Sequence, residues 1–233
     1  EEVARRAKYI LIRLDGGLTW MVHLGMSGRF TVNPGPAARA SSGQIGHNSG
    51  WQLADKHDHV TVELEDGGIV TYNDPRRFGF MDLIDGPAGL AGHAMLAPLG
   101  PEPLSDDFNA DYFSARLKGK RGPIKAALLD QKLVAGLGNI YVCEALWRAG
   151  ISPKRMAGSV AGRRAARLVP EIKQVLSDAI AAGGSSLRDF VHADGELGYF
   201  QHSWDAYDRE GKACRRPGCG GKLTRIVQSG RST

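Results

Sequence analysis

The stretch QKLVAGLGNIYVCEALWRAGISP, from Gln131 to Pro153, decides how the chain folds. A glycine-rich turn that ends at Asn139 precedes an amphipathic run, residues 140–149, whose apolar positions recur at helical spacing. Asn139 is the expected N-cap of this helix, and Gly150 is expected to end it. Free amides at such a helix start suit a phosphate group, but an ordinary helix–turn–helix corner explains the pattern equally well at the local level.

Helices are also predicted on the N-terminal side of this stretch. Ser105 or Asp106 is expected to cap a helix that runs to Leu117, because their side chains can accept hydrogen bonds from the first free amides. Pro123 is expected to start the next helix, where its missing N–H is of no consequence.

A long helix is predicted after the stretch, capped by Ser159 and ending at Gly183 and Gly184. Pro170 lies inside it and is expected to kink or split it, because proline lacks the amide that the helix needs. The side chains that share one face, and that we expect to be buried, are Leu168, Ile172, Val175, Leu176 and Ala179.

The N-terminal part of the chain has the pattern of a β-sandwich or barrel. Short, often alternating apolar runs separated by Asp-Gly or Gly-Gly turns predict strands at residues 9–14, 18–24, 59–64, 69–72 and 78–84. The segment from Asn33 to Asp55 is rich in Gly, Ala, Pro and Ser without periodicity, which predicts a long loop. Residues 85–104 are expected to form a Gly/Pro-rich connector, and residues 207–233 a short, basic, β-like segment.

Composition and charge narrow the class of protein. Hydrophobic residues make up 42 % and charged residues 24 % of the 233 residues, which is a globular profile. No apolar run approaches the ~18 residues of a membrane span and no signal-peptide pattern is present, so a cytoplasmic protein without a membrane partner is expected. The net charge is +5, and the last 33 residues carry seven basic and three acidic side chains. This distribution favours a polyanionic partner.

The three cysteines predict no disulfide framework, because their number is odd and the profile is cytoplasmic. Cys143 lies on the helix of the central stretch and is expected to be a buried thiol. Cys214 and Cys219 lie in KACRRPGCGGKL, which has the pattern of a knuckle-like loop.

Three segments of the β part carry unusual polar residues. RRAKY, residues 5–9, is more typical of a solvated strand end than of a site. HLGMSG, residues 23–28, holds Met26 between two glycines, where an exposed methionine is suited to contact a stacked surface. In KHDHV, His57 and His59 share one strand face, but no further ligands accompany them, so a metal site there is not favoured.

DPRRFG, residues 74–79, is the most specific of these polar segments. Asp-Pro forms a turn, and Arg76, Arg77 and Phe78 follow it directly. Arginine offers forked donors to a phosphate or a base edge, and phenylalanine can stack on bases or wedge between them. Together with the helix start at Asn139, this segment favours a nucleic-acid enzyme or binding protein over a small-molecule protein.

Six motifs occur in a fixed order: HLGMSG, KHDHV, DPRRFG, LGPEPLSDDF, LVAGLGNIYVCEALWRAGISP and the closing QSGRST. In this order and at these separations they resemble formamidopyrimidine-DNA glycosylases (Fpg). The resemblance covers nearly the whole chain, except that the segment from Asn33 to Asp55 looks like an insertion. The endonuclease VIII-like glycosylases share the architecture, but DPRRFG and HLGMSG favour Fpg.

The resemblance implies an α+β multidomain fold. It consists of an incomplete N-terminal β-sandwich with its connector (1–104), a helix–two-turn–helix domain (105–206) and part of an Fpg-type zinc-finger hairpin (207–233). It also implies a base-excision-repair enzyme that removes oxidised purines, such as 8-oxoguanine and formamidopyrimidines, from duplex DNA. The family flips the damaged nucleotide out, excises its base through a Schiff base on an N-terminal proline, and cuts the strand by β,δ-elimination.

Roles of individual residues follow from the resemblance alone. Lys8 would be the proton donor of β-elimination, and Arg231 that of δ-elimination. The family contacts DNA at the positions of His57, Arg76, Lys120, Lys125 and Asn139, the last two facing phosphates near the lesion.

Met26, Arg76 and Phe78 match the side chains that fill the gap left by the flipped nucleotide. Cys214 and Cys219 match the first half of a four-cysteine site for one structural Zn²⁺, although their C-x4-C spacing is wider than the C-x2-C of the family. A flexible loop that forms part of the base pocket is expected within Val191–Gln201. A monomer in a bacterial-type cytoplasm, associated with the nucleoid through its substrate, is the implied setting.

The chain departs from the family pattern at both ends. It begins with EEVARRAKY, about fifty residues into that pattern, without the N-terminal proline and the acid that follows it. It ends at Thr233, before the second cysteine pair. We therefore expect a chain truncated at both termini and inactive as a glycosylase. A non-enzymatic remnant that binds damaged DNA and an RNA-binding helix–turn–helix module are the alternatives.

Overall fold

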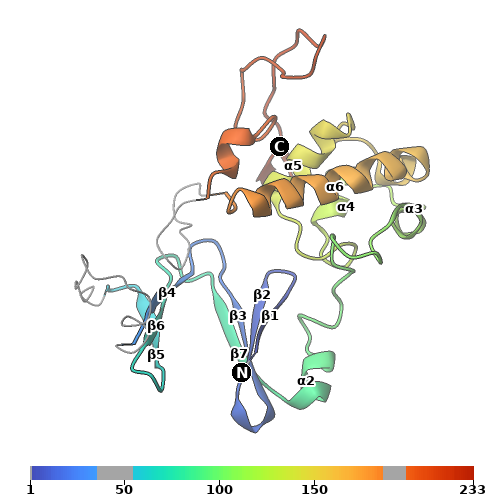
Figure 1. The fold of residues 1–233 in the computed structure, drawn as a ribbon. Coiled ribbons are helices and arrows are strands. Elements are labelled where there is room, and N and C mark those ends of the chain that lie inside the picture. The colour runs from blue at the N-terminus through green and yellow to red at the C-terminus, as the bar shows by residue number, and fades with distance from the viewer. Residues whose placement is uncertain (1, 36–54, 186–197) are drawn as a thin grey trace.

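The structure is a computed structural model that describes residues 2–35, 55–185 and 198–233. A β domain, a helical domain and a C-terminal extension follow one another along the chain and lie one above the other in Figure 1. Most of the predicted Asn33–Asp55 loop, and most of the Val191–Gln201 segment, lies outside the described residues.

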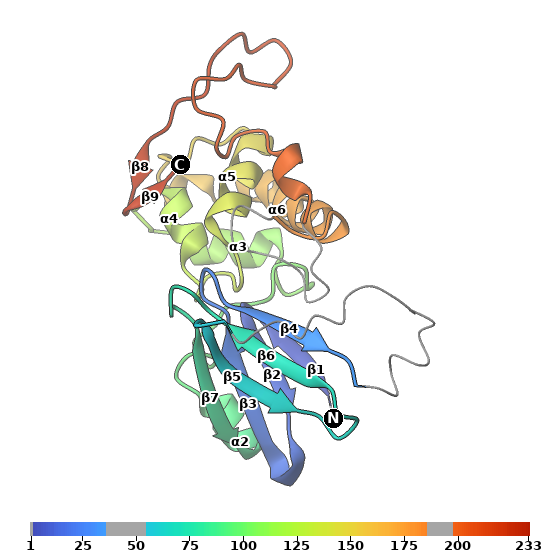
Figure 2. The ribbon, with the colours of Figure 1, turned by 90° about the vertical axis from the view of Figure 1, so that its left-hand side faces the viewer.

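The β domain contains two antiparallel sheets, which Figure 2 displays as two layers. The four-stranded sheet has the order β1 (Val3–Arg6), β2 (Tyr9–Arg13), β3 (Leu18–His23) and β7 (Phe80–Asp85), and the three-stranded sheet has the order β4 (Arg29–Asn33), β6 (Ile69–Asn73) and β5 (Asp58–Glu63). All five predicted strands are confirmed. β1 and β4 are additional, because each is short and half polar and therefore carries little periodic signal.

Aromatic side chains join the two sheets. Phe30 of β4 lies 5.9 Å from Trp20 of β3 and 5.4 Å from Tyr72 of β6, measured between ring centroids. Both pairs are tilted or edge-on, an arrangement that aromatic rings prefer over face-to-face stacking. Sandwich packing is thus the architecture that the alternating strand pattern predicted.

The connector is more regular than expected. Residues 86–92 form a helix, α2 (Gly86–Gly92), in spite of their glycines. Pro87 in its first turn presets the helical φ angle, and Leu90 packs against the buried Met21, Ile84 and Leu96. Packing of the partly buried Leu90 against the four-stranded sheet therefore supports the helix in spite of the low helix propensity of the segment.

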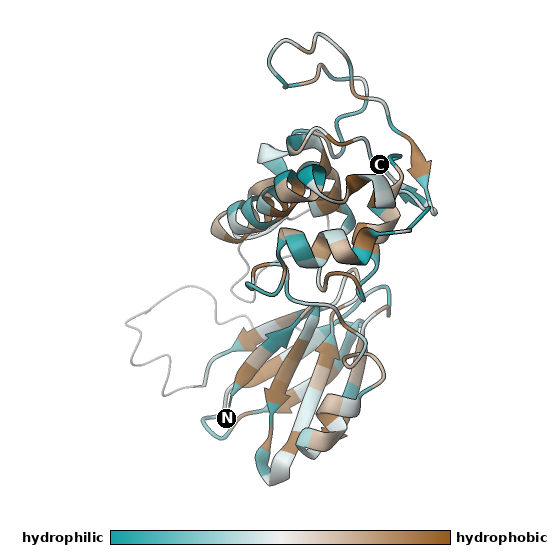
Figure 3. Cartoon of the chain, turned by 90° about the vertical axis from the view of Figure 1, so that its right-hand side faces the viewer, coloured by the Kyte–Doolittle hydropathy of each residue, from teal (hydrophilic) through white to brown (hydrophobic). Residues whose placement is uncertain are grey.

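The helical domain holds the main apolar core. Its helices are α3 (Ala110–Leu117), α4 (Ile124–Leu129), α5 (Asn139–Arg148) and α6 (Arg163–Ala181), with a short 3₁₀ turn over Ala157–Val160. Figure 3 displays apolar and polar segments in alternation along these helices and along the strands, as expected where each element buries one face. The fully buried large side chains of this core include Phe108, Phe113, Leu117, Ile124, Leu128, Leu146 and Leu168.

Three of the predicted helix caps are wrong, those of α3, α5 and α6. α3 begins later than expected, because Asn109 caps it by accepting a hydrogen bond from the Tyr112 amide (2.9 Å), while Ser105 turns back onto the Glu102 carbonyl. α5 begins at Asn139, so Gly138 occupies the cap position. The Asn139 amide group instead donates to the carbonyl of Ser232, a contact that no local pattern reveals.

α6 also differs from the expectation. Ser159 lies in the preceding 3₁₀ turn and donates to the carbonyl of Met156, and Gly162, at φ +76°, precedes the helix. Pro170 does not split the helix, which is continuous over 19 residues. Packing outweighs the hydrogen bond lost at Pro170, because five side chains near or after it are buried, namely Leu168, Val169, Ile172, Val175 and Ala179. Leu176 is only partly buried.

The C-terminal extension ends in a hairpin of β8 (Val227–Gln228) and β9 (Arg231–Ser232). Ser229 and Gly230 both have positive φ angles, as a two-residue hairpin turn requires. A 3₁₀ turn, η3 (Phe200–Ser203), precedes the extension. Within the described ranges, no helix has the length and apolar character needed to cross a membrane.

Candidate nucleic-acid interface

The carboxylate of Asp74 joins two loops of the β domain, residues 24–28 and 74–79. Asp74 is 1 % exposed. One of its oxygens accepts a hydrogen bond from the Ser27 hydroxyl (2.6 Å), and the other accepts from the Gly79 amide (2.8 Å) and the Tyr72 hydroxyl (3.1 Å). Ser27 in turn accepts from the Arg76 amide (3.2 Å). A buried charge with this many donors is satisfied, so it fixes both loops.

The electrostatics of this network follow from its hydrogen bonds. Burial by itself raises the pKa of Asp74, but the donors on Ser27, Gly79 and Tyr72 outweigh burial and hold the pKa below its usual value. Burial and the neighbouring charge of Asp74 raise the pKa of Tyr72 to about 12. Asp74 is therefore ionised and Tyr72 protonated at neutral pH.

Two glycines allow the loops to approach each other. Gly25 has φ +66°, and a Cβ there would lie 2.6 Å from the carbonyl carbon of Phe78. A Cβ at Gly79 would overlap the Tyr72 hydroxyl. Larger residues at either position would push the loops apart, so the glycines of HLGMSG and DPRRFG are explained by close backbone contact.

The loops expose the three side chains that the sequence singled out. Met26 is 68 % and Phe78 57 % exposed, although both are large and apolar. The Arg76 guanidinium lies 4.7 Å from the centre of the Phe78 ring, within cation–π distance. The structure thus combines an apolar wedge, formed by Met26 and Phe78, and a cation, Arg76, on one small surface. The hydrogen bonds of Asp74 fix the two loops that carry them.

A cavity of about 380 Å³ lies beside the Met26 loop, between the β domain and α5. It is lined by Lys8, His23, the loop from Leu24 to Gly28, and Tyr141 of α5. The Lys8 residue as a whole is exposed, but its ammonium group reaches the domain junction and donates to the Leu137 carbonyl (2.9 Å). Desolvation of that group, together with the charge of Arg231, lowers the pKa of Lys8.

His23 is a site residue that the sequence reasoning missed. Its Nδ1 accepts a hydrogen bond from the Gly25 amide (3.0 Å), which assigns the proton of the neutral ring to Nε2. Burial and the charge of Lys8 lower the pKa of His23, so the ring is neutral at pH 7. His23 opens the HLGMSG motif, which was interpreted for its methionine only. Tyr141 gave no signal, because it lies within the apolar pattern of α5.

The C-terminal hairpin docks onto the helical domain through two polar side chains. Lys125 is 1 % exposed, and its ammonium group donates to the Ser232 carbonyl (2.7 Å) and to the Thr233 hydroxyl. Asn139 donates to the same Ser232 carbonyl (3.0 Å). The hairpin thereby holds the exposed Arg231 close enough to Lys8 to lower the pKa of Lys8. Residues from both ends of the chain thus share one site.

The remaining predicted DNA contacts, His57 and Lys120, both lie on loops. The His57 carbonyl accepts from the Asp74 amide (3.0 Å), so His57 adjoins the DPRRFG turn. Lys120 lies in the loop between α3 and α4. Within the described part of the chain, neither side chain forms a hydrogen bond or an ion pair. The phosphate contacts predicted for Lys125 and Asn139 remain predictions.

The Arg5 side chain is 59 % exposed, as a solvated strand end implies, and that of Arg6 is 30 % exposed, but neither is unpaired. Both are paired with Glu102 of the connector, at 2.8 and 2.7 Å. The expectation missed this contact because the two segments are far apart in the sequence.

The two C-terminal cysteines do not form a complete metal site within the described residues. Cys214 is half-buried and Cys219 exposed. A hydrogen bond from the Arg216 amide is the main cause that lowers the pKa of Cys214, which favours the thiolate. In the described ranges, no three His, Cys, Asp or Glu side chains are arranged so that they could hold a metal ion together. Tetrahedral zinc needs four ligands. Cys143 is buried as predicted, and burial raises its pKa to about 11.

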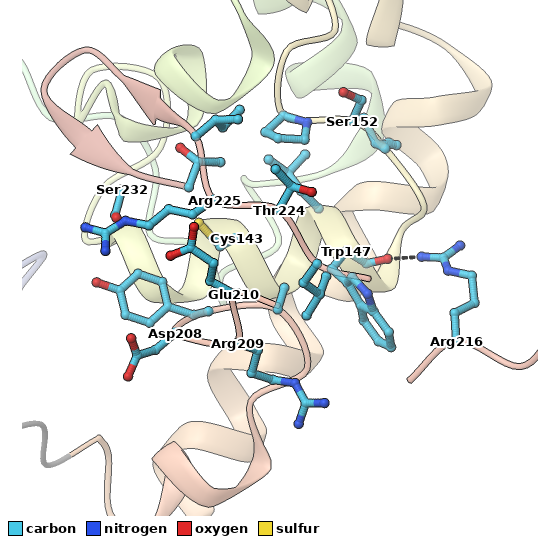
Figure 4. A pocket seen from close by; sticks show the side chains of 18 of the residues that line it. Cys143, Trp147, Ser152, Asp208, Arg209, Glu210, Arg216, Thr224, Arg225 and Ser232 are labelled. Atoms are coloured by element: carbon cyan, nitrogen blue, oxygen red, sulfur yellow. Dashed lines mark hydrogen bonds between the residues drawn. The ribbon is translucent and has the colours of Figure 1, made fainter. Parts of the chain in front are cut away.

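A larger cavity, of about 520 Å³, separates α5 from the C-terminal extension (Figure 4). Its floor includes Cys143 and Trp147 of α5, and Asp208, Glu210 and Arg225 line its other side. Arg216 closes one end, where its guanidinium donates to the Trp147 carbonyl and lies over the Trp147 ring. This cavity shares no lining residue with the cavity beside Lys8, although Ser232 and Thr233, which anchor the hairpin of Arg231, line it.

Two family models match the chain. Residues 1–81 match the model described as formamidopyrimidine-DNA glycosylase N-terminal domain, and residues 99–191 match the formamidopyrimidine-DNA glycosylase H2TH domain. A formamidopyrimidine-DNA glycosylase of Ruegeria pomeroyi is 58 % identical over 233 residues, which are 100 % of this chain and 80 % of the relative.

Solved structures agree with these matches. The MutM (Fpg) protein of Thermus thermophilus has a TM-score of 0.83 and 38 % identity, over 100 % of this chain and 79 % of that protein. The Lactococcus lactis Fpg, in a complex with DNA containing an abasic site, has a TM-score of 0.83 and 31 % identity, over 99 % and 78 % of the two chains. These matches confirm the predicted α+β fold.

The first prediction concerns the acid sensitivity of the Asp74 network. Because the pKa of Asp74 is lower in the folded state than in the unfolded state, its carboxylate stabilises the fold above the ordinary pKa of about 3.9. That stabilisation is lost as the pH falls through the folded-state pKa. We expect Asp74→Asn to lower the free energy of unfolding by about 1–3 kcal/mol at pH 7 and to have a smaller effect below pH ~4. Urea denaturation at several pH values measures this.

The matched control is Asp66→Asn. Asp66 accepts a single hydrogen bond, from the Gly68 amide in the turn between β5 and β6. Its replacement should cost less than that of Asp74 at pH 7. A cost for Asp74→Asn that equals the control, or that stays constant down to pH 3, contradicts the prediction.

Proposed function

Because the chain belongs to the formamidopyrimidine-DNA glycosylase family, we propose that it acts on duplex DNA containing an oxidised purine or an abasic site. The reaction is that of a DNA glycosylase with lyase activity, which removes 8-oxoguanine or formamidopyrimidine bases and cuts the strand by β,δ-elimination. The described residues include those that we propose to contact DNA and to act in the elimination steps.

One observation carries this proposal. The amine of Lys8, with a lowered pKa, lies in a cavity beside the exposed Met26 loop, and Arg231 is close to it. Enzymes that act on a base must take the nucleotide out of the stack, and apolar wedges commonly occupy the space it leaves. A wedge next to a cavity lined by Lys8, with a second cation, Arg231, close to Lys8, is the arrangement that such a reaction needs.

Each residue then has a stated task. Met26, Phe78 and Arg76 fill the gap in the duplex, with Arg76 directed by its contact with the Phe78 ring. Lys8 donates the proton of β-elimination, for which a pKa nearer to neutrality than that of ordinary lysine is favourable. Arg231 donates in the δ step. No step is assigned to a metal ion.

A non-enzymatic protein that binds damaged DNA is the second candidate. The same wedge and cations support it, because binding alone does not need the lowered pKa of Lys8. The two candidates differ in one measurable respect, namely strand cleavage at a pre-formed abasic site that depends on Lys8.

The test is therefore cleavage of a duplex with one abasic site under single-turnover conditions. We expect Lys8→Ala to lower the rate at least ~10-fold, as removal of a positioned proton donor does. The control is Lys118→Ala, an exposed lysine after α3, which should leave the rate unchanged. No cleavage by the unmodified chain, with tight binding of the same duplex, would favour the binding protein.

The pH dependence of cleavage gives a further readout in the same experiment. Lys8 loses its proton as the pH rises through its pKa, so the rate should fall on the alkaline side, below the ordinary lysine value of about 10.4. Arg231→Gln should move this alkaline limb to higher pH, because the charge of Arg231 contributes to the lowered pKa of Lys8. An unchanged limb would contradict this coupling.

A third prediction separates the two adjacent arginines of DPRRFG. Arg76 contacts the Phe78 ring, whereas Arg77 has φ +55° and no such contact within the described residues. Arg76→Ala should weaken binding of a duplex with an abasic-site analogue about tenfold, which corresponds to about 1.4 kcal/mol. Arg77→Ala should have a clearly smaller effect. Equal losses, measured by fluorescence anisotropy, would mean that the pair acts as a diffuse basic patch.

A fourth prediction compares two lysines of the helical domain. A side chain that neutralises one phosphate contributes about −0.9 to the slope of log K against log salt. Lys120→Met should remove about one such unit, because Lys120 is partly exposed on a loop and has no ion-pair partner in the described ranges. Lys125→Met should leave the slope unchanged and lower stability instead, because the Lys125 ammonium is buried against Ser232 and Thr233. A reduced slope in Lys125→Met would support the phosphate contact predicted for it.

A further inference from the structure

The connector residue Glu102 collects three donors from one turn of the β domain. Its carboxylate accepts from the Arg5 guanidinium (2.8 Å), the Arg6 guanidinium (2.7 Å) and the Ala7 amide (2.7 Å). Arg6 also donates to the carbonyls of Leu99 and Gly100, beside Glu102 on the connector. The turn between β1 and β2 is thereby tied to the connector by five hydrogen bonds from two arginines and one amide.

This turn needs an external hold. Ala7 has φ +52°, in the left-handed region that is unfavourable for a residue with a Cβ. Such a conformation persists only where the surroundings determine it. Ala7 is buried, and its amide and carbonyl are both used, by Glu102 and Arg5 respectively. Lys8 is the next residue, so the direction of its side chain depends on the same turn.

The helical domain contacts the turn from the other side. Lys8 donates a hydrogen bond to the Leu137 carbonyl, and Gly136 lies next to the Ala7 backbone. Gln131 braces this glycine turn, because its side chain accepts from the Gly136 amide (2.9 Å) and donates to the Leu137 carbonyl (3.1 Å). The Gln131 carbonyl accepts from Gly100 of the connector (2.9 Å). Connector, glycine turn and β1–β2 turn therefore form one hydrogen-bonded junction.

We propose that Glu102 is the positioning residue of this junction, which fixes the β1–β2 turn and with it the Lys8 side chain against the helical domain. The part that concerns chemistry rests on the proposed function of Lys8. Glu102 does not contact the cavity beside the Met26 loop, so its effect on the reaction is exerted through the turn.

The charge state of Glu102 agrees with this role. Burial raises its pKa, but the Ala7 amide and the two guanidinium groups outweigh burial and lower it. The carboxylate is therefore ionised at neutral pH. The same hairpin offers a contrasting pair at its opposite end, where Glu2 and Arg13 are 3.3 Å apart and both well exposed. An exposed pair of this kind contributes little to stability.

The experiment compares Glu102→Ala, Glu102→Gln and the matched control Glu2→Ala in the full 233-residue chain. The first readout is hydrogen exchange at the Ala7 amide, which needs no DNA. We expect at least ~10-fold faster exchange in Glu102→Ala, a smaller increase in Glu102→Gln, which keeps one acceptor, and no change in Glu2→Ala. The second readout is the single-turnover rate of abasic-site cleavage, together with the Kd for an abasic-site analogue.

For cleavage we expect a fall of at least ~10-fold in Glu102→Ala, with Kd changed by less than ~3-fold. A merely structural role would weaken binding and cleavage together. Unchanged exchange at Ala7 overturns the hold on the turn, and faster exchange with an unchanged rate overturns the positioning of Lys8.

If Glu102→Ala does not fold, the Gln variant decides by the same two readouts. If the unmodified chain shows no Lys8-dependent cleavage, the proposed function fails, and exchange at Ala7 alone decides whether Glu102 fixes the turn.

Discussion

The glycine turn before α5 is the constraint on which the candidate site depends. On one side of Gly138, the Leu137 carbonyl accepts from Lys8 of the β domain, and on the other side Asn139 donates to Ser232 of the C-terminal hairpin. Lys8 and Arg231 come from opposite ends of the chain, and two consecutive polar contacts of one turn bring them together. Gly136, at φ +78°, permits the backbone path that presents both groups, because a side-chain-bearing residue rarely adopts this conformation.

Buried or half-buried carboxylates organise the loops that the apolar cores do not reach. Asp74 joins two loops of the β domain, and Glu102 ties the β1–β2 turn to the connector. Glu144 of α5 is fully buried and accepts from three consecutive amides, those of Asp205, Ala206 and Tyr207, at 2.7–3.0 Å. These loops have too few apolar side chains to be held in place by hydrophobic burial. An ionised carboxylate that accepts from several donors forms directional hydrogen bonds and is fully satisfied.

The regular part of the fold could be predicted from the sequence because its signals are local. Alternation predicted the five strands, and helical spacing predicted α5 and most of the buried face of α6. The helix caps were harder to predict, because several residues within a few positions can act as a cap. Which of them does so depends on contacts with distant parts of the chain. Asn139 illustrates this, since its side chain is used by Ser232, 93 residues away. The carboxylate of Glu102, in the motif LGPEP, is bonded to residues 5–7, which are far away in the sequence, so only the folded chain reveals its role.

The same distinction limits what the net charge of +5 says about a polyanionic partner. Arg5 and Arg6 share the single negative charge of Glu102, Arg148 pairs with Asp178, and Lys125 is buried against the hairpin. None of these four cations is available to attract a phosphate without first breaking an internal contact. Among the cations that remain exposed, Arg76 lies on a loop joined to the Met26 loop through Ser27, and Arg231 lies on the hairpin close to Lys8. The positions of the unpaired positive charges therefore say more about the binding face than the number of basic residues does.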